Sequence, residues 1–214
     1  MQASQDTKPR WERRKDARPQ ELLAAALEQF VERGYAATRL EDVAKRAGVS
    51  KGTLYLYFAN KEELFKAVVR ENIVATIGEA EQDAATFDGP SGELLGALLM
   101  KWWTEVCATP LGGITKLMLA EGNNFPELAL FYNEEVVARG SSLFTRVLAR
   151  GVESGEFRPV DPVVMTQVLI APVMMLLMWT HSYMPTCDMP PVAPEVFMET
   201  FIQTTLRGLK ADAP

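Results

Sequence analysis

Residues 43–58, VAKRAGVSKGTLYLYF, carry the pattern of a helix, a tight turn and a second, shorter helix. Together with Leu40, apolar residues at i, i+3, i+4 and i+7 give the first helix one apolar stripe. Gly48 follows at a point where a chain leaving a helix often needs a positive φ. Ser50 is placed to accept a hydrogen bond from a main-chain N–H of the next helix. This geometry predicts a helix-turn-helix, which places its second helix in the DNA major groove.

The residues on the outer face of this second helix are not typical of a face that contacts only solvent. Leu54 and Phe58, four residues apart, form its narrow inner stripe. On a helical wheel, a glycine, a threonine, a tyrosine and a leucine point away from that stripe, with Lys51 on its flank. Such a face favours contact with a partner. An ordinary αα-hairpin is the alternative, and the turn by itself does not decide between the two.

The flanking segments favour the helix-turn-helix. Thr38, with Glu41 three residues later, has the spacing of a capping box, which predicts a helix start there. Residues 60–63, NKEE, have the same capping-box spacing and begin a helix that is predicted to run to about residue 82. Upstream, a helix is predicted to start at Pro19 and to end at Gly34, and it completes a three-helix head.

With these features in place, residues 20–66 resemble the N-terminal DNA-binding domain of the TetR/AcrR family of bacterial transcriptional regulators. The resemblance covers about a quarter of the chain, and the remainder is similar to the family in length and helical character. The matching residues are Phe30, Gly34, Tyr35, Thr38, Val43, Ala44, Ala47-Gly48-Val49-Ser50, Gly52, Leu54-Tyr55, Tyr57-Phe58 and Asn60-Lys61-Glu62.

The resemblance implies two kinds of DNA contact in this head. Gly52 would let the second helix approach the groove closely, and Thr53 and Leu56 would reach base edges. Leu56 departs from the pattern, because many relatives carry an aromatic or polar residue there; it would offer apolar contact to a thymine methyl group. The remaining contacts would go mostly to phosphates, from Thr38, Lys51, Tyr55, Tyr57 and Lys61, with Arg39 and Ser50 completing the set.

The distribution of charge also separates the head from the rest. Residues 1–61 carry 12 Lys and Arg against 8 Asp and Glu, a net charge of +4, whereas residues 62–214 carry 10 against 20, a net charge of −10. A basic head on an acidic body suits a protein that meets a polyanion with one end only. Residues 1–18 are predicted to form a basic flexible arm, either a solubilising tail or a source of phosphate and minor-groove contacts.

Beyond the head, the periodicity predicts only helices, about nine in the whole chain, and the predicted fold class is all-α. Residues 163–179, VVMTQVLIAPVMMLLMW, are apolar nearly all round. This run is shorter than a membrane span, contains Pro172 and lacks flanking Lys or Arg, so burial is expected and no membrane partner. The burial is predicted to include a second copy of the chain, as a homodimer through residues 162–183 and 195–209.

The residue inventory argues against an enzyme. His181 is the single histidine, so no histidine cluster can hold zinc, and neither Cys107 nor Cys187 has a partner at CxxC spacing. No Ser-His-Asp set with a recognisable elbow, no Walker loop and no dinucleotide glycine loop is present. We therefore predict no catalytic residue, no metal and no cofactor. The distant cysteines form no disulfide framework, and with no secretory leader they favour the cytoplasm.

Aromatic and methionine residues of the body are either core or the wall of a ligand pocket. At helical spacing such residues are more often core, and the neighbours Trp102 and Trp103 cannot both face the same way. Because members of the family typically bind a small effector inside the body, the resemblance implies a pocket for an apolar or aromatic molecule. The residues predicted to form it are Trp102, Trp103, Met118, Phe125, Phe131, Tyr132, Phe144 and Met175.

Three parts are thus predicted: a basic arm at 1–18, a helix-turn-helix DNA-binding domain at 19–66, and an effector-binding and dimerisation domain at 67–214. By the resemblance, the chain would be a repressor that binds double-stranded DNA at a palindromic operator as a homodimer and is released by a small apolar molecule. The alternative is a helical interaction module or adaptor that has the same fold but does not bind DNA. The basic head and the recognition helix argue against that alternative.

Overall fold

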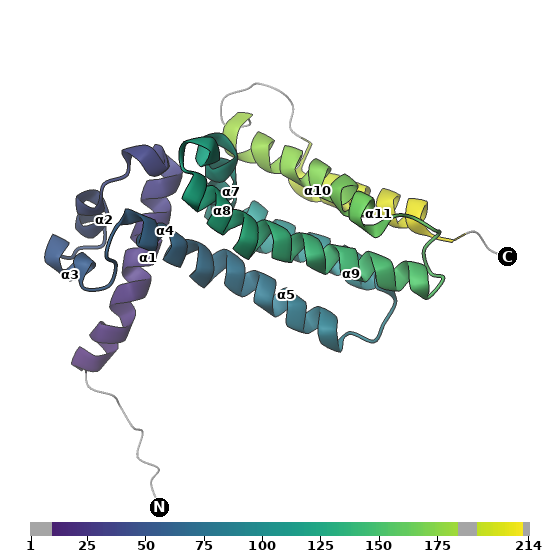
Figure 1. Cartoon of the computed structure of the whole chain (residues 1–214), viewed down its shortest axis with the longest axis horizontal. Coiled ribbons are helices and arrows are strands. Elements are labelled where there is room, and N and C mark those ends of the chain that lie inside the picture. The colour runs from purple at the N-terminus through teal and green to yellow at the C-terminus, as the bar shows by residue number, and fades with distance from the viewer. Residues whose placement is uncertain (1–9, 184–191, 212–214) are drawn as a thin grey trace, which may run out of the picture. The chain divides into compact units, whose positions relative to one another are not determined.

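The computed structural model describes residues 10–183 and 192–211, and the side chains of residues 19–182 and 192–211. Within these ranges the chain is all-α, as predicted, with nine continuous helices and no strand (Figure 1). It divides into two compact units, residues 1–68 and residues 69–214, which are called the head and the body below.

The head consists of α1 (Arg10–Ala37), α2 (Leu40–Arg46), α3 (Lys51–Tyr55) and most of α4 (Lys61–Val69). The predicted start of the first helix at Pro19 is wrong, because the backbone is helical from Arg10 and Pro19 lies inside α1. A proline removes one main-chain N–H from the helix, but the helical backbone continues on both sides of it. The backbone of residues 10–18, in the predicted arm, is thus helical, and residues 1–9 lie outside the described part of the chain.

An aromatic cluster forms the centre of the head. The ring centroids of Phe30 and Tyr35 lie 5.8 Å apart, and Phe65 from α4 meets them edge-on at 5.2 Å and 5.5 Å. Edge-to-face contacts of this kind add to the free energy gained by burying the rings. Leu54 from α3 is fully buried in the head core, as its place on the inner stripe predicts. The cluster therefore joins the first helix of the head to its last.

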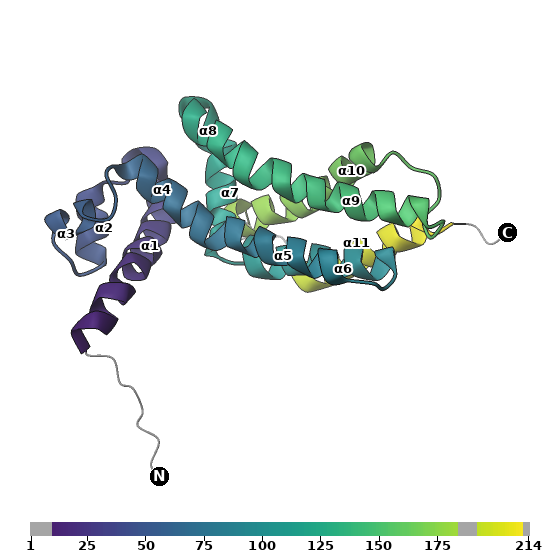
Figure 2. The same ribbon diagram turned by 60° about the horizontal axis from the view of Figure 1, so that its bottom comes forward.

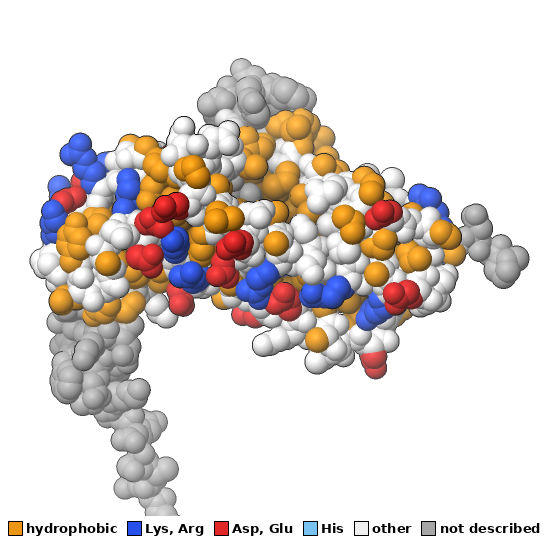
Figure 3. Space-filling model, viewed as in Figure 1, with side chains coloured by type: hydrophobic (Ala, Val, Ile, Leu, Met, Phe, Trp, Pro, Cys, Tyr) orange, Lys and Arg blue, Asp and Glu red, His pale blue; other side chains and the backbone are white. Residues whose placement is uncertain are grey.

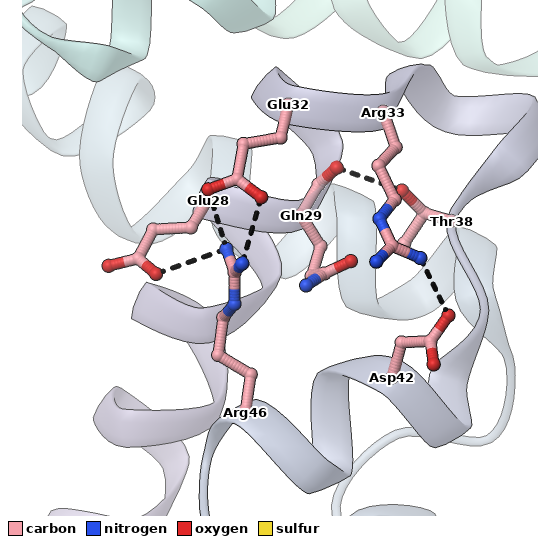
Figure 4. Close-up of polar contacts among 7 residues, drawn as sticks. All are labelled: Glu28, Gln29, Glu32, Arg33, Thr38, Asp42 and Arg46. Atoms are coloured by element: carbon pink, nitrogen blue, oxygen red, sulfur yellow. Dashed lines mark hydrogen bonds and ion pairs between the residues drawn. The ribbon is translucent and has the colours of Figure 1, made fainter.

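Ion pairs fasten α2 to α1 (Figure 4). Arg46 donates to both carboxylate oxygens of Glu32, at 2.9 Å and 2.8 Å, and to Glu28 at 3.2 Å. The hydrogen bond from Arg46 lowers the pKa of the Glu32 carboxyl. Arg33 donates to Asp42 at 3.0 Å in a second pair. These pairs are exposed, so each contributes little to stability, but the contact of Arg46 with both carboxylate oxygens of Glu32 also helps to set the direction of α2.

The end of α1 is stabilised from outside the helix. Gly34 has a φ of 81°, which ends the regular helix as predicted and leaves main-chain carbonyls without partners inside it. The ammonium of Lys61 donates hydrogen bonds to the carbonyl oxygens of Tyr35, Ala36 and Thr38, at 2.7, 3.2 and 3.1 Å. An ammonium has three N–H donors, and all three are thus engaged within the head.

The predicted capping box at the start of α2 is wrong. The residue before the helix is Arg39, and its side chain caps nothing. Thr38 is 1% exposed, and its hydroxyl donates to the carbonyl oxygens of Gln29 at 3.1 Å and Gly34 at 2.7 Å (Figure 4). Glu41 pairs instead with Lys51. The hydroxyl faces α1 because the carbonyls at the end of that helix need donors, whereas a capping hydroxyl must accept.

The body is a bundle of helices (Figure 2). After α4 the helical backbone continues through the π-helical turn η1 (Arg70–Val74) into α5 (Ala75–Thr86). The elements that follow are α6 (Ser91–Trp102), η2 (Trp103–Cys107), α7 (Pro110–Glu121), η3 (Gly122–Asn124), α8 (Pro126–Tyr132), η4 (Asn133–Ala138), α9 (Arg139–Glu153), α10 (Pro162–Met178), η5 (Trp179–Tyr183) and α11 (Pro194–Leu209). In the bundle α9 packs against both α6 and α10, and α11 packs against α6.

Two sequence predictions for the C-terminal part need comment. The last helix begins at Pro194, slightly before the predicted start at Val196, because proline is well tolerated in a first helical turn. Most of the predicted extended connection, residues 185–191, and Cys187 within it lie outside the described residues.

The apolar helix α10 is covered on one side only. Leu169, Val173, Leu176 and Leu177 are buried against the body. The opposite side leaves a stripe in water, where Val164 is 60%, Val168 53%, Met175 53% and Trp179 40% exposed. These four residues recur at helical spacing along one face, and hydrophobic side chains gather there in the space-filling view (Figure 3).

The length of this helix does not exclude a membrane span, contrary to the sequence argument. Together with most of η5 it forms a helix over Pro162–Ser182, 21 residues with a hydropathy of 1.9, which is long and apolar enough to cross a bilayer. The core helix of a water-soluble protein passes the same test. Within one copy 28% of the tested stretch is buried, and several of its other residues are exposed.

Replacing Lys61 by methionine should destabilise the head. The substitution keeps most of the side-chain volume but leaves three carbonyl oxygens at the end of α1 without their donor. Hydrogen bonds from a charged group are each worth about 1.5–3 kcal/mol, and water can replace part of them, so we expect a loss of roughly 2 kcal/mol. Urea unfolding followed by circular dichroism measures it.

Lys45→Met is the matched control for this experiment. Lys45 is an exposed residue of α2, so its replacement should leave the free energy of unfolding nearly unchanged. Equal stabilities of the two variants would show that the Lys61 contacts do not support the head.

Candidate nucleic-acid interface and ligand cavity

The turn before α3 has the local geometry that the sequence predicts. Gly48 has a φ of 67°, in the left-handed region that favours glycine. The Ser50 hydroxyl accepts a hydrogen bond from the main-chain N–H of Thr53 at 3.1 Å, which caps α3. The side chain of Asn60 caps α4 in the same way, by accepting from Glu63 N–H at 2.8 Å. The short recognition helix is therefore fixed at its start by its own sequence.

The outer face of α3 and of the turn after it is open. Leu56 is 83% exposed, Tyr55 45% and Tyr57 37%. Lys51 lies beside them, paired with Glu41 and 5.7 Å from the centre of the Tyr55 ring. The hydrogen bond with Glu41 raises the pKa of Lys51, so this side chain remains a cation. A leucine, two phenols and a cation on one face can offer apolar contact, hydrogen bonds and charge to a partner.

Gly52 is not required by the fold of the head. A Cβ built on this residue would meet one atom within 4 Å, the Ser50 Oγ at 3.7 Å, which is ordinary van der Waals contact. Its φ is not positive, so alanine would fit the helix without strain. A glycine at the second position of a five-residue helix lowers helix stability, and its lack of a side chain leaves room for close approach by another molecule.

Two of the predicted phosphate contacts have another role in the structure. Thr38 is buried with its hydroxyl directed into the head, and all three donors of the Lys61 ammonium bind main-chain carbonyls. Both residues hold the scaffold and neither presents a free donor at the surface of α3. Arg39 is exposed at the start of α2, so it can still reach a phosphate. The candidate interface is thus Arg39 with residues 50–57, and their contact with DNA stays a prediction.

The body contains a cavity of about 440 Å³, which is in the range of ligand-binding cavities. Its wall comes from η1, α5, α6, η2, α7, α8, η4, α9 and α10. Four of the residues predicted for a pocket line it: Trp102, Met118, Tyr132 and Phe144. The ring centroids of Trp102 and Phe144 lie 5.9 Å apart, with the ring planes inclined at 53°.

The other four predicted pocket residues lie elsewhere. Trp103 is 2% exposed in the hydrophobic core, because its side chain leaves the helix in a different direction from that of Trp102. Phe131 is buried under the guanidinium of Arg70, 4.9 Å from its ring centre. Met175 belongs to the exposed face of α10. Phe125 is the residue before α8 and is not part of the wall.

Aliphatic residues form the part of the wall that the sequence predictions missed. A search restricted to aromatic residues and methionine could not find them, although their helical spacing is visible in the sequence. They include Ile73, Ile77, Leu98, Val106, Val136, Leu143 and Ile170.

Six residues of the cavity wall carry a hydroxyl, amide or ammonium group: Thr76, Lys101, Thr115, Tyr132, Asn133 and Ser141. The hydroxyls of Thr115 and Tyr132 share a hydrogen bond of 2.8 Å, and burial raises the pKa of Tyr132, so this phenol stays neutral. Lys101 donates to Asp83 at 2.8 Å and lies 3.9 Å from Glu79. The hydrogen bond with Asp83 raises the pKa of Lys101 and keeps it charged.

His181 and Cys107 have structural roles. A ring nitrogen of His181 lies 2.7 Å from the carbonyl oxygen of Cys107, and the main-chain carbonyl of His181 accepts from Lys116 at 2.6 Å. Burial raises the pKa of the Cys107 thiol to about 12, so it is not a reactive thiolate. Among the residues with described side chains, no group of three His, Cys, Asp or Glu could hold a metal ion.

Comparison with known proteins agrees with this division into head and body. The family model for bacterial regulatory proteins of the tetR family matches residues 22–68, and the model for the tetracyclin repressor-like C-terminal domain matches residues 91–189. The fatty acid metabolism regulator protein of Bacillus subtilis (strain 168) is 30% identical over 147 residues, which are 67% of this chain and 74% of that protein.

Two further similarities extend over most of the chain. The uncharacterized HTH-type transcriptional regulator YhgD of Bacillus subtilis (strain 168) is 26% identical over 89% of this chain and 96% of its own length. The crystal structure of the transcriptional regulator FadR from Bacillus subtilis in complex with stearoyl-CoA aligns with a TM-score of 0.74 at 24% identity. That alignment covers 89% of this chain and 98% of the other, and it supports the fold.

The matched proteins are transcriptional regulators and not enzymes, which confirms the prediction made from the residue inventory. The helix-turn-helix head, the open face of α3 and the helical body lead to the same conclusion: this chain belongs to the TetR family of transcriptional regulators.

Proposed function

We propose that the chain is a cytoplasmic repressor that binds a palindromic operator as a homodimer and is released from DNA when a small, mainly apolar molecule occupies the cavity of the body. The observation that carries the DNA-binding part is the open face of α3, capped by Ser50, with Gly52 at its centre and Leu56 83% exposed. No requirement of the head itself accounts for that combination.

The chemistry of this face supports recognition of the major groove. Thr53 can donate to or accept from a base edge, and Leu56 can contact a thymine methyl group. Tyr55, Tyr57, Lys51 and Arg39 can contact phosphates on either side, and the net charge of +4 over residues 1–61 favours approach to DNA.

The exposed stripe of α10 supports the homodimer. Val164, Val168, Met175 and Trp179 would lie in water in a single copy, and a stripe of this kind marks an interaction surface. From α11, Val196 is 54% exposed and could extend the contact. A two-fold axis would pair each helix with its own copy, and two heads related by that axis require a palindromic site.

The lining of the cavity supports an apolar effector. Its wall is aromatic and aliphatic with few polar groups, as ligand cavities generally are. The Bacillus subtilis relative is named as a regulator of fatty acid metabolism, and the similar solved structure carries stearoyl-CoA, so binding of apolar molecules has precedent among similar proteins.

Fluorescence anisotropy with labelled DNA tests the DNA-binding part directly. The duplex is the stretch upstream of the protein's own gene, and an unrelated duplex of equal length is the competitor. A repressor of this kind should bind its own DNA tightly, with an affinity that falls steeply as salt is raised. Equal affinity for the two duplexes, or none, would favour the helical adaptor without DNA binding.

Gly52→Ala should separate DNA binding from folding. Alanine stabilises a helix interior by about 1 kcal/mol relative to glycine, so the thermal midpoint should stay constant or rise. The added methyl group faces the partner, and the affinity for DNA should fall by about 10-fold or more, equivalent to roughly 1.4 kcal/mol. Gly78→Ala, with open space around its Cβ in α5, is the control and should bind as the wild type does. Unchanged affinity in Gly52→Ala would remove this face from the interface.

Val168→Asp and Met175→Asp should convert the dimer to a monomer. Each places a carboxylate in the apolar stripe, where burial against a second copy would cost several kcal/mol. Light scattering coupled to size exclusion at micromolar concentration measures the mass. Leu130→Asp is the control, since Leu130 is 59% exposed on α8, away from that stripe. A wild-type chain that is already monomeric under these conditions would contradict the proposal.

Trp102→Ala should abolish release by effector while DNA binding without effector is retained. The indole forms a wall of the cavity opposite Phe144, so its loss removes contact with the ligand. The measurement is the concentration of a releasing compound, found by screening apolar aromatics, that halves the DNA complex. Phe157→Ala truncates a buried ring of the core outside the cavity and controls for general destabilisation. Equal release in Trp102→Ala and wild type would place the effector elsewhere.

A further inference from the structure

The polar pair in the cavity wall is incompletely bonded. The Thr115 and Tyr132 hydroxyls lie 2.8 Å apart and share one hydrogen bond, in which either oxygen can be the donor. Two hydroxyls carry two hydrogens, so one O–H remains after that bond is made. Among the residues with described side chains, neither hydroxyl has a further hydrogen-bond partner. One donor is therefore available at the surface of a mainly apolar cavity.

The remaining O–H of this hydroxyl pair, at the surface of a mainly apolar cavity, favours a ligand that carries a hydrogen-bond acceptor. A hydroxyl removed from water without a new partner loses free energy, and a carbonyl, ester or ether oxygen would restore the missing bond. Tyr132 is 6% exposed, so bulk water has little access to its side chain. The pair is one of the few polar groups of a wall that also includes Thr76, Asn133 and Ser141. Other residues of the wall, such as Val106 and Val136, offer only apolar contact.

The charges at the cavity disfavour an anion. Lys101 is the one charged residue among the described residues of the wall, and its ammonium is already bound to Asp83 at 2.8 Å with Glu79 at 3.9 Å. Glu105 adds a third carboxylate near this ammonium. A carboxylate ligand that approached this ammonium would be repelled by the three carboxylates already near it.

We propose that the cavity takes a neutral, mainly apolar molecule with one hydrogen-bond acceptor, of the ketone or ester class, which the Thr115–Tyr132 hydroxyl pair receives. This inference rests on the proposed function only in identifying the cavity as the effector site. It assigns Thr115 and Tyr132 as the residues that determine specificity.

The test compares three molecules of nearly the same shape on the full-length protein. They are 2-acetylnaphthalene with a ketone oxygen, 2-isopropenylnaphthalene with a methylene group in its place, and 2-naphthoate with an anionic carboxylate. Each competes with the neutral fluorescent probe N-phenyl-1-naphthylamine. The ketone should bind about 2- to 12-fold more tightly than the hydrocarbon, the range expected for one hydrogen bond, and the anion should bind most weakly.

Removing the two hydroxyls should erase the preference for the ketone. In the double variant Thr115→Val with Tyr132→Phe, the ratio of ketone to hydrocarbon affinity should fall to about one, while the hydrocarbon binds as before. The control variant, Thr200→Val with Tyr55→Phe, removes the same two groups outside the cavity and should keep the wild-type ratio. Circular dichroism establishes that each variant is folded, and the three wild-type affinities remain decisive if the double variant does not fold.

Three results would overturn the inference: equal binding of ketone and hydrocarbon by the wild type, tightest binding of the naphthoate, or binding of none of the three. Retention of the ketone preference in a folded double variant would overturn the assignment of the pair. Release of DNA is measured separately. A ketone that binds through the pair but leaves the DNA complex intact would contradict the proposed effector response and leave this inference standing.

Discussion

The head depends on how its first helix ends. The positive φ of Gly34 stops α1 and leaves carbonyl oxygens that need donors, and two residues far apart in the chain supply them. Thr38 donates from just before α2, and Lys61 donates from the first turn of α4. A buried acceptor left without a partner costs about 1–3 kcal/mol, whereas an exposed ion pair such as Arg33–Asp42 contributes about 0–1 kcal/mol. The carbonyl contacts therefore decide where α2 begins, and the capped turn at Gly48 and Ser50 then fixes α3.

The parts of the head that the sequence predicts correctly are those whose partners are close in the chain. Ser50 bonds Thr53, Asn60 bonds Glu63, and the φ of Gly48 follows from its own lack of a side chain. The family resemblance implies a phosphate contact for Lys61, yet its ammonium binds carbonyl oxygens of residues that lie 23 to 26 positions away in the chain. No local pattern distinguishes a lysine that caps a distant helix from one that faces DNA.

The same limit applies to the cavity, for a different physical reason. Whether a helical residue meets packed atoms or empty space depends on the neighbouring helices, and core and wall residues share one periodicity. Trp102 and Trp103 illustrate this, since the first lines the cavity and the second fills the core. The exposed apolar stripe of α10 has a sequence signal, because residues 163–179 are apolar nearly all round. Which side remains open follows only from the packing of α10 on α9.

Three π-helical turns of the body contribute to the wall of the cavity. Ile73 of η1, Val106 of η2 and Val136 of η4 all belong to the wall. Such turns are rare, often occur at functional sites, and differ from an α-helix in which carbonyl each N–H reaches. A ligand can shift a conformational equilibrium only by binding one state better than the other, and typical couplings are about 1–3 kcal/mol. One hydrogen bond contributes about 0.5–1.5 kcal/mol net, so a change in one or two main-chain hydrogen bonds of a single turn is enough to supply a coupling free energy of this size. Of these turns, η1 is the one that follows α4 without a break, and the first turn of α4 supplies Lys61 to the head. An effector that acts on the DNA-binding helices through the covalent chain must therefore act through η1.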